Sequence, residues 1–191
     1  MSTNHRFELP PDLPVPIDDG ACDHLVGMEV PRACLPSTAE RLVCLHDFSV
    51  ERIVLYGYPR TGTPGVPVPK DWDLIPGARG CTPETCSFRE HHAQLRSLGA
   101  ETFGFSTQTT AYQQELVQRL QLPFEILSDA DFVFTTALRL PTFEFNGMTL
   151  IKRLTLIIER GHITKVFYPI FPPDKHAAEV VHWLSIEPPR L

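Results

Sequence analysis

Residues 52–58 read Arg-Ile-Val-Leu-Tyr-Gly-Tyr, a continuous apolar and β-branched run that stops at Pro59. A run of this kind predicts a central strand buried on both faces, because a strand with one exposed face would alternate apolar and polar residues. Proline ends the run since it has no backbone N–H to donate to a neighbouring strand. This strand is therefore the expected centre of the fold.

Strand and helix patterns alternate along the rest of the chain. A long loop over residues 59–80 leads to a helix with Thr82 as its expected N-cap, Pro83 at its first position and Gly99 as its stop. Further runs predict a leading hairpin over residues 28–35 and 40–45, strands at 101–106, 124–127, 148–159 and 162–168, and helices at 109–120, 130–138 and 173–184. This order predicts an α/β, thioredoxin-like fold with a central mixed β-sheet flanked by helices.

Length and charge narrow the class of protein. The 191 residues suit one domain, and we expect residues 1–24 to form an N-terminal arm and residues 25–191 to form the domain. The net charge of −6 argues against a nucleic-acid partner, because phosphate binding needs clustered Lys and Arg. No apolar run reaches the roughly 18 residues of a membrane span, and residues 1–12 lack a signal-peptide core. We therefore expect no membrane partner and a cytoplasmic location.

The five cysteines are the first candidates for chemistry, and their odd number argues against a complete disulfide framework. Cys81 stands at the start of the predicted helix, where unpaired backbone N–H groups and the helix dipole favour a thiolate and lower the pKa of the thiol. An unreactive small buried cysteine is an equally good interpretation of that position alone. A metal site is disfavoured, because no second cysteine pair matches and Cys22, Cys34 and Cys44 are scattered.

Cys86 follows five residues after Cys81. In an intact helix this spacing separates the two residues by about 7.5 Å along the axis and turns their side chains to different faces. A disulfide needs Cα atoms within roughly 7 Å and Cβ atoms that are directed toward each other. If the two cysteines bond, the first turns of the helix must therefore unwind.

Residues 76–90 read Pro-Gly-Ala-Arg-Gly-Cys-Thr-Pro-Glu-Thr-Cys-Ser-Phe-Arg-Glu and resemble the active-site segment of Q-type peroxiredoxins, also called bacterioferritin comigratory proteins. The family pattern has Gly-Cys-Thr, an acidic residue, a second cysteine five after the first, and a Phe-Arg-Asp-like end. The resemblance covers roughly residues 28–185. It includes Phe-Gly-Phe-Ser-Thr at 103–107, Leu-Ser-Asp-Ala-Asp at 127–131 and Lys-Arg-Leu-Thr-Leu-Ile-Ile at 152–158.

The resemblance implies a thiol peroxidase that needs no metal or organic cofactor. Cys81 matches the peroxidatic cysteine, which attacks a hydroperoxide and becomes a sulfenic acid, and Cys86 matches the resolving cysteine, which forms a disulfide with it. Thioredoxin or a similar dithiol donor would reduce that disulfide. Arg153 matches the arginine that faces the peroxidatic sulfur, and Glu84 matches an acidic residue that could orient this arginine. We expect a monomer or weak homodimer.

The chain departs from the family at the usual Pro-x-x-x-Thr-x-x-Cys unit. Pro59-Arg-Thr-Gly-Thr63 fits its first part, but residues 66–80 then stand as an inserted loop before the cysteine. We expect Pro59 and Thr63 to keep their roles, with the Thr63 hydroxyl bonding to peroxide or thiolate, and the inserted loop to lie over the site. Thr82 or backbone N–H groups are the alternative donors.

Two other functions stay open at this stage. A thioredoxin-class dithiol–disulfide oxidoreductase would share the fold, although its usual Cys-x-x-Cys is absent. The inserted loop is also consistent with a redox-regulated binding module that keeps the fold but has lost turnover. His91 and His92 are adjacent, so on a helix they face different directions and make a poor metal chelate.

Overall fold

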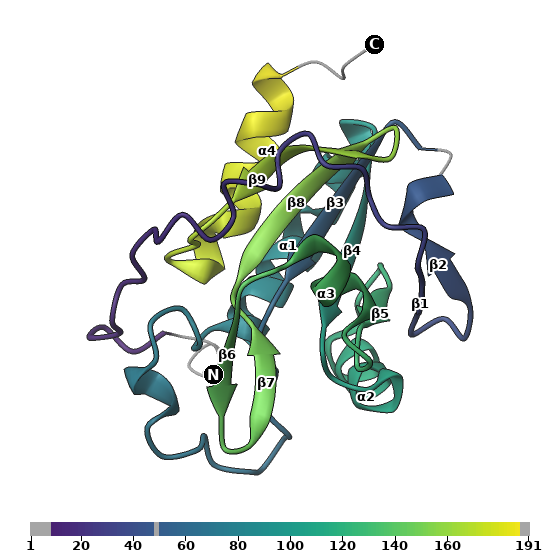
Figure 1. Ribbon diagram of the computed structural model, residues 1–191. Coiled ribbons are helices and arrows are strands. Elements are labelled where there is room, and N and C mark those ends of the chain that lie inside the picture. Colours follow the sequence, from purple (N-terminus) through teal and green to yellow (C-terminus); the bar gives the residue numbers. More distant parts are fainter. Residues whose placement is uncertain (1–8, 48–49, 188–191) are drawn as a thin grey trace.

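A five-stranded mixed sheet forms the centre of the molecule in this computed structural model, which describes residues 9–47 and 50–187 (Figure 1). The strand order is β5-β4-β3-β8-β9. The strands are β3 (Arg52–Gly57), β4 (Ala100–Ser106), β5 (Ile126–Ser128), β8 (Leu154–Glu159) and β9 (His162–Phe167). β3 pairs parallel with β4 and antiparallel with β8. The predicted α/β, thioredoxin-like fold is confirmed.

Strand β3 is buried on both faces, as the apolar run predicts. Val54 and Tyr56 point into a cluster that also contains side chains of α1 (Cys81–Ser97), α2 (Thr110–Leu120) and α4 (His176–Ile186). Ile53 and Leu55 point into the opposite cluster. Because strand side chains alternate between faces, full burial requires a cover on each side of the sheet.

The second cover is built from three short pieces of chain. They are residues 22–30, the hairpin of β1 (Cys34–Pro36) and β2 (Leu42–Cys44), and the helix α3 (Val133–Leu138). A leading hairpin forms as predicted, but its first strand is displaced, since β1 overlaps the expected 28–35 only at Cys34 and Leu35, while β2 lies within the expected 40–45. A bridge between Ser37 and Leu127 joins the hairpin to the edge strand β5. Cys34 and Cys44 form a disulfide across the hairpin.

The predicted strand over residues 148–159 is wrong in one respect, since it is broken in two. Its first part, β7 (Met148–Ile151), pairs with β6 (Thr142–Phe145), which the sequence analysis missed, and forms a separate hairpin. The phenyl rings of β6 pack against Trp72, in a short 3-10 helix over Trp72–Leu74 of the loop before α1. The hairpin therefore turns away from the sheet, and the chain crosses into β8 at Lys152 and Arg153.

Helix α1 begins earlier than predicted. Its N-cap is Gly80 rather than Thr82, and Cys81 is the first helical residue. Gly80 has a φ of 105° and approaches Pro173 so closely that an added Cβ would lie 2.4 Å from the proline ring, so only glycine fits there. The predicted stop is confirmed, because the helix ends at Ser97 and Gly99 has a φ of 75°.

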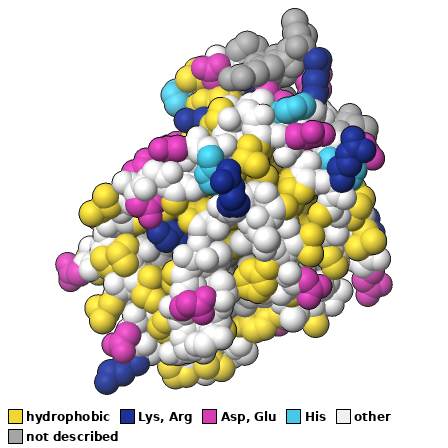
Figure 2. Space-filling model, in the orientation of Figure 1, with side chains coloured by type: hydrophobic (Ala, Val, Ile, Leu, Met, Phe, Trp, Pro, Cys, Tyr) yellow, Lys and Arg dark blue, Asp and Glu magenta, His cyan; other side chains and the backbone are white. Residues whose placement is uncertain are grey.

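The C-terminal segment is split as well. The expected helix over 173–184 consists of a 3-10 turn at Pro173–Lys175 followed by α4, which packs beside α1. A further 3-10 turn at Leu45–Asp47 follows β2. On the face drawn in Figure 2, acidic and basic side chains are interspersed among apolar ones. None of the helices within residues 9–47 and 50–187 has the length and apolar character to cross a membrane.

Candidate active site

Arg153 and Cys81 meet although 72 positions separate them in the sequence. Arg153 lies at the break between β7 and β8, and Cys81 opens α1. The Nη2 atom of Arg153 donates a hydrogen bond to the Cys81 sulfur over 3.2 Å. Both side chains are almost completely buried, with relative exposures of 3% and 4%. A permanent cation therefore lies in direct contact with the sulfur, inside the protein.

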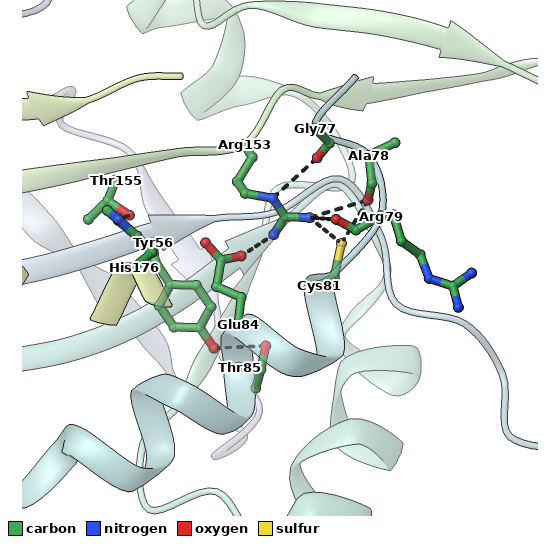
Figure 3. A network of polar contacts seen from close by, with 10 residues as sticks. All are labelled: Tyr56, Gly77, Ala78, Arg79, Cys81, Glu84, Thr85, Arg153, Thr155 and His176. Atoms are coloured by element: carbon green, nitrogen blue, oxygen red, sulfur yellow. Dashed lines mark hydrogen bonds and ion pairs between the residues drawn. The ribbon is translucent and has the colours of Figure 1, made fainter. Parts of the chain in front are cut away.

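The guanidinium group of Arg153 is held on several sides (Figure 3). Glu84, one turn along α1, forms a buried ion pair with its Nη1. The Nε atom donates to the carbonyl of Gly77 over 3.2 Å, and Nη2 donates to the carbonyls of Ala78 and Arg79 over 3.2 and 3.3 Å. These carbonyls belong to the end of the segment that the sequence analysis identifies as an insertion. That segment therefore positions the arginine.

Burial changes the electrostatics of the pair from what the sequence predicted. The pKa of the Cys81 thiol is raised, because burial penalises the thiolate more than the charge and hydrogen bond of Arg153 favour it; the Glu84 carboxylate raises it further. Burial also raises the pKa of Glu84, against the lowering effect of Arg153. The predicted lowering of the Cys81 pKa is therefore wrong for the reduced protein. The prediction assumed a solvent-exposed helix start, whereas Cys81 is buried.

A second polar cluster lies beside the Glu84 carboxylate. His176, the first residue of α4, is 1% exposed, and its ring nitrogens lie 2.9 Å from the Thr155 hydroxyl and 3.0 Å from a Glu179 carboxylate oxygen. Figure 3 shows His176 and Tyr56 near Glu84, on the side away from Cys81. No sequence pattern indicated His176 as part of the site. A lone histidine at the start of a distant helix carries no signal that would connect it to the cysteine motif.

Cys86 lies on the same helix as Cys81, and both are free thiols. It is 7% exposed and packs among apolar residues that include Phe88 and Leu116. Burial raises the pKa of the Cys86 thiol, and the nearby Arg89 acts in the opposite direction. The helix is intact from Cys81 onward, so this structure represents the reduced form, in which the expected disulfide has not formed.

Cys81 opens onto a pocket with a volume of about 310 Å³. One wall comes from the inserted segment and is mainly apolar; its residues are Val66, Pro67, Val68, Pro69 and Trp72. Arg60 and Arg79 also line the pocket, and none of its lining residues is acidic. Arg79 forms an ion pair with Asp73 over 3.0 Å. Apolar surface therefore lies in the same pocket as the cysteine.

The two remaining predicted site residues line two different pockets. Thr63 lines the pocket, but its hydroxyl lies 3.0 Å from the Tyr112 hydroxyl and bonds there. Thr82, the alternative donor, lines the same pocket. Pro59 is buried and lines a separate cavity of about 380 Å³, together with Arg153. The structure thus brings Cys81, Arg153 and Glu84 into contact, with Thr63 in the Cys81 pocket and Pro59 in the separate cavity.

The adjacent histidines have ordinary surroundings. His91 contacts the Ser87 carbonyl over 2.9 Å, within its own helix. His92 is buried beside the ring of Phe124. Within residues 9–47 and 50–187, no three side chains of His, Cys, Asp or Glu are grouped so that they could hold a metal ion.

Known proteins resemble this chain over most of its length. The family model described as Redoxin matches residues 25–181. A relative from Coxiella burnetii (strain RSA 493 / Nine Mile phase I), named as a peroxiredoxin bcp, is 28% identical over 162 residues, which cover 82% of this chain and 95% of the relative. Chloroplastic peroxiredoxin Q of Oryza sativa subsp. japonica is 28% identical over 160 residues, 83% of this chain and 66% of that protein.

A solved structure supports the fold independently. The crystal structure of peroxidoxin BcpB from Mycobacterium tuberculosis has a TM-score of 0.69 against this chain, with 24% identity, and the match covers 86% of this chain and 99% of that one. The family model spans the whole sheet, both cysteines of α1, and Arg153.

Proposed function

Because this chain belongs to the Redoxin family, we propose that it is a thiol peroxidase of the peroxiredoxin Q type, with Cys81 as the peroxidatic cysteine and Cys86 as the resolving cysteine. The observation that carries the proposal is the hydrogen bond from Arg153 to the Cys81 sulfur at the first residue of a helix. A buried cysteine with no chemical role would not need a buried cation at hydrogen-bond distance.

In the first step the Cys81 thiolate attacks the terminal oxygen of a hydroperoxide. A sulfur–oxygen bond forms, the oxygen–oxygen bond breaks, and the departing alkoxide or hydroxide takes up a proton and leaves as an alcohol or water. Cys81 becomes a sulfenic acid. Arg153 supports this step in two ways, because its charge stabilises the thiolate and its N–H groups can donate to the peroxide oxygens.

Glu84 limits how strongly Arg153 can stabilise the Cys81 thiolate. The carboxylate and the thiolate share one cation, and ionising both would leave a net negative charge in a buried site. Burial raises the pKa of both groups, Arg153 acts in the opposite direction on each, and the Glu84 carboxylate raises the pKa of Cys81 further. Glu84 and the three loop carbonyls are therefore positioning groups, which hold the guanidinium against the Cys81 sulfur.

In the second step the Cys86 thiol attacks the sulfenic sulfur, a disulfide forms, and water leaves. The residues are five positions apart on an intact helix, so the first turns of α1 must open. A dithiol donor of the thioredoxin class then reduces the disulfide by two successive thiol exchanges. The protein would act as a monomer or weak homodimer in the cytoplasm.

The pocket supports organic hydroperoxides as substrates in addition to hydrogen peroxide. Its apolar wall includes Val66 and Val68, whose exposed fractions are 62% and 46%. Apolar surface of this kind gains free energy when an alkyl or aryl group covers it, whereas hydrogen peroxide cannot use it. The inserted segment thus supplies the part of the site that would distinguish the two kinds of peroxide.

Stopped-flow mixing of the reduced protein with hydrogen peroxide and with cumene hydroperoxide tests the proposal. We expect Cys81→Ser to abolish the reaction and Cys86→Ser to react once and stop as a sulfenic acid, which dimedone would trap. Turnover at the normal rate by Cys81→Ser would refute the assignment. Dithiol–disulfide exchange without any peroxide reaction would favour a thioredoxin-class oxidoreductase, and neither activity would favour a binding module.

Hydrogen exchange tests the opening of α1. Amides 84–92 should exchange faster in the oxidised protein than in the reduced protein, because a Cys81–Cys86 bond cannot form in the intact helix. Mass spectrometry would first confirm which bond is present. Equal protection in both states would contradict the unwinding step and leave the peroxidase assignment untouched.

A further inference from the structure

The disulfide between Cys34 and Cys44 has no part in the peroxide chemistry proposed above. The two residues face each other directly in the β1–β2 register, with their Cα atoms 4.2 Å apart. Cys34 is exposed and Cys44 is half-buried, in contrast to Cys81 and Cys86, which are buried. The hairpin lies at the β5 edge of the sheet, apart from the N-terminal end of α1 (Figure 1).

A recess beside Cys34 gives another molecule room to approach. Its volume is about 260 Å³, and it is lined by the β1 strand, the start of α2 and the segment that leads into α3. Val133, at its rim, is 52% exposed, and Leu42 on the neighbouring strand is 65% exposed. Cys34 lines this recess and is exposed, whereas Cys44 is half-buried and does not line it, so Cys34 is the more accessible target for an attacking thiolate.

The hairpin does not depend on the disulfide for its place in the fold. Leu35 and Val43, next to the two cysteines, are 3% and 1% exposed and belong to the core cluster. At the hairpin turn, Arg41 forms a bidentate ion pair with Glu125. Ser37 donates to the same carboxylate. Breaking the bond therefore leaves the hairpin packed, so the bond can open and close without unfolding of the domain.

We propose that Cys34 and Cys44 form a second redox-active pair, which exchanges with external dithiols through attack at Cys34. The dithiol thiolate attacks the Cys34 sulfur, a mixed disulfide forms, and Cys44 leaves as a thiolate that takes up a proton. The second donor thiol then displaces Cys34, so that the protein gains two electrons and two protons and the donor becomes a disulfide. The reverse reaction reoxidises the pair, which therefore follows the redox state of the surrounding dithiol pool.

The test uses a variant with only this pair, Cys22→Ser/Cys81→Ser/Cys86→Ser, incubated with defined ratios of reduced and oxidised dithiothreitol. Iodoacetamide labelling and mass spectrometry count the free thiols. We expect a reversible change between no label and two labels. The reduction rate should be proportional to dithiothreitol concentration and independent of urea below the unfolding transition. A rate that saturates at the global unfolding rate would overturn the proposal and make the bond a structural crosslink.

Two measurements keep the result clear. In the same background, Cys44→Ser and Cys34→Ser each leave one thiol, and Cys34 should react with 5,5′-dithiobis(2-nitrobenzoate) at least about tenfold faster than Cys44. Equal rates would refute attack at Cys34. For the natural chain, peptide mapping after dithiothreitol treatment at pH 7 should show the same two labels at 34 and 44, which excludes an effect of the three substitutions.

The peroxidase proposal stands or falls separately. Cys34→Ser/Cys44→Ser keeps Cys81, Cys86 and Arg153, and its first reaction with hydrogen peroxide reports on the peroxidatic site alone. A protein that undergoes thiol–disulfide exchange at Cys34 but never reacts with peroxide would refute only the peroxidase proposal. A protein that reacts with peroxide but does not undergo exchange at Cys34 would refute only the proposal of a second redox-active pair.

Discussion

Replacing Arg153 by Met removes the cation that contacts the Cys81 sulfur, and we expect the pKa of Cys81 to rise further. Two unit charges 3.2 Å apart attract by about 5 kcal/mol at an effective dielectric constant of about 20, which sets an upper limit of about four pKa units. The observed rise should be smaller, about one to three units, because Glu84 loses the same cation and will then bind a proton.

The assay is the absorbance of the thiolate near 240 nm as a function of pH, in a Cys22→Ser/Cys86→Ser background where Cys81 is the free thiol that remains. The second-order rate constant with hydrogen peroxide should fall by about 100-fold or more, the loss seen when one preorganised donor is removed. Arg153→Lys keeps the positive charge but loses the planar guanidinium group with its several N–H donors, so it should give an intermediate rate.

Substitutions at Glu84 provide matched controls for the folding of Arg153→Met and for the direction in which the pKa of Cys81 changes. Arg153→Met leaves Glu84 buried without its partner, which could cost about 3–5 kcal/mol of stability, so Arg153→Met/Glu84→Gln is the companion variant. Glu84→Gln alone should lower the pKa of Cys81, because it removes a like charge. The double variant should titrate above wild type and close to Arg153→Met, because Glu84 is already protonated once Arg153 is gone. An unchanged titration in Arg153→Met, with the protein folded, would refute the proposed role of the arginine.

Three further predictions test the surroundings of the site. Val66→Ser/Val68→Ser should raise the KM for cumene hydroperoxide about three- to tenfold and leave hydrogen peroxide unaffected, because only the aryl substrate covers the apolar wall; equal changes for both would contradict this. Gly80→Ala should lower the urea midpoint, since its Cβ would lie 2.4 Å from a proline ring at a φ of 105°, whereas the control Gly62→Ala, with open space around its Cβ, should not. The pKa of Asp19 is lowered to about 2, chiefly by its hydrogen bond to Lys152. The stability from this pair should therefore be present above pH 4 and disappear as pH falls toward 2, and wild type and Asp19→Asn should converge in urea midpoint there.

Much of the fold follows from local patterns in the sequence. The run at residues 52–58 has one physical solution, a strand covered on both faces, and the structure places it at the centre of the sheet. Gly99 ends α1 as predicted, because a left-handed residue after a helix is a local requirement. The spacing of Cys81 and Cys86 also predicts two thiols on one helix that stay apart while it is intact, and both are free.

Local patterns failed where distant segments compete. Residues 148–159 look like one strand, because both halves are apolar and β-branched, but the first half pairs with β6 and packs toward Trp72 instead. The resulting break leaves Arg153 outside the strand ladder. Likewise the N-cap position of α1 must be a glycine, Gly80, because Pro173, from the other end of the chain, occupies the space where a side chain would lie.

The electrostatics of the site depended on tertiary structure most of all. The sequence by itself determined that a cysteine begins a helix, and from that position it predicted a more acidic thiol. Packing decided that Cys81 is buried, that it shares one arginine with Glu84, and that the carbonyls of residues 77–79 hold that arginine. The balance between burial and a single shared cation arises only when α1, the inserted segment and the β7–β8 break are brought together. No local pattern encodes that balance, because the cation comes from Arg153, 72 positions after Cys81.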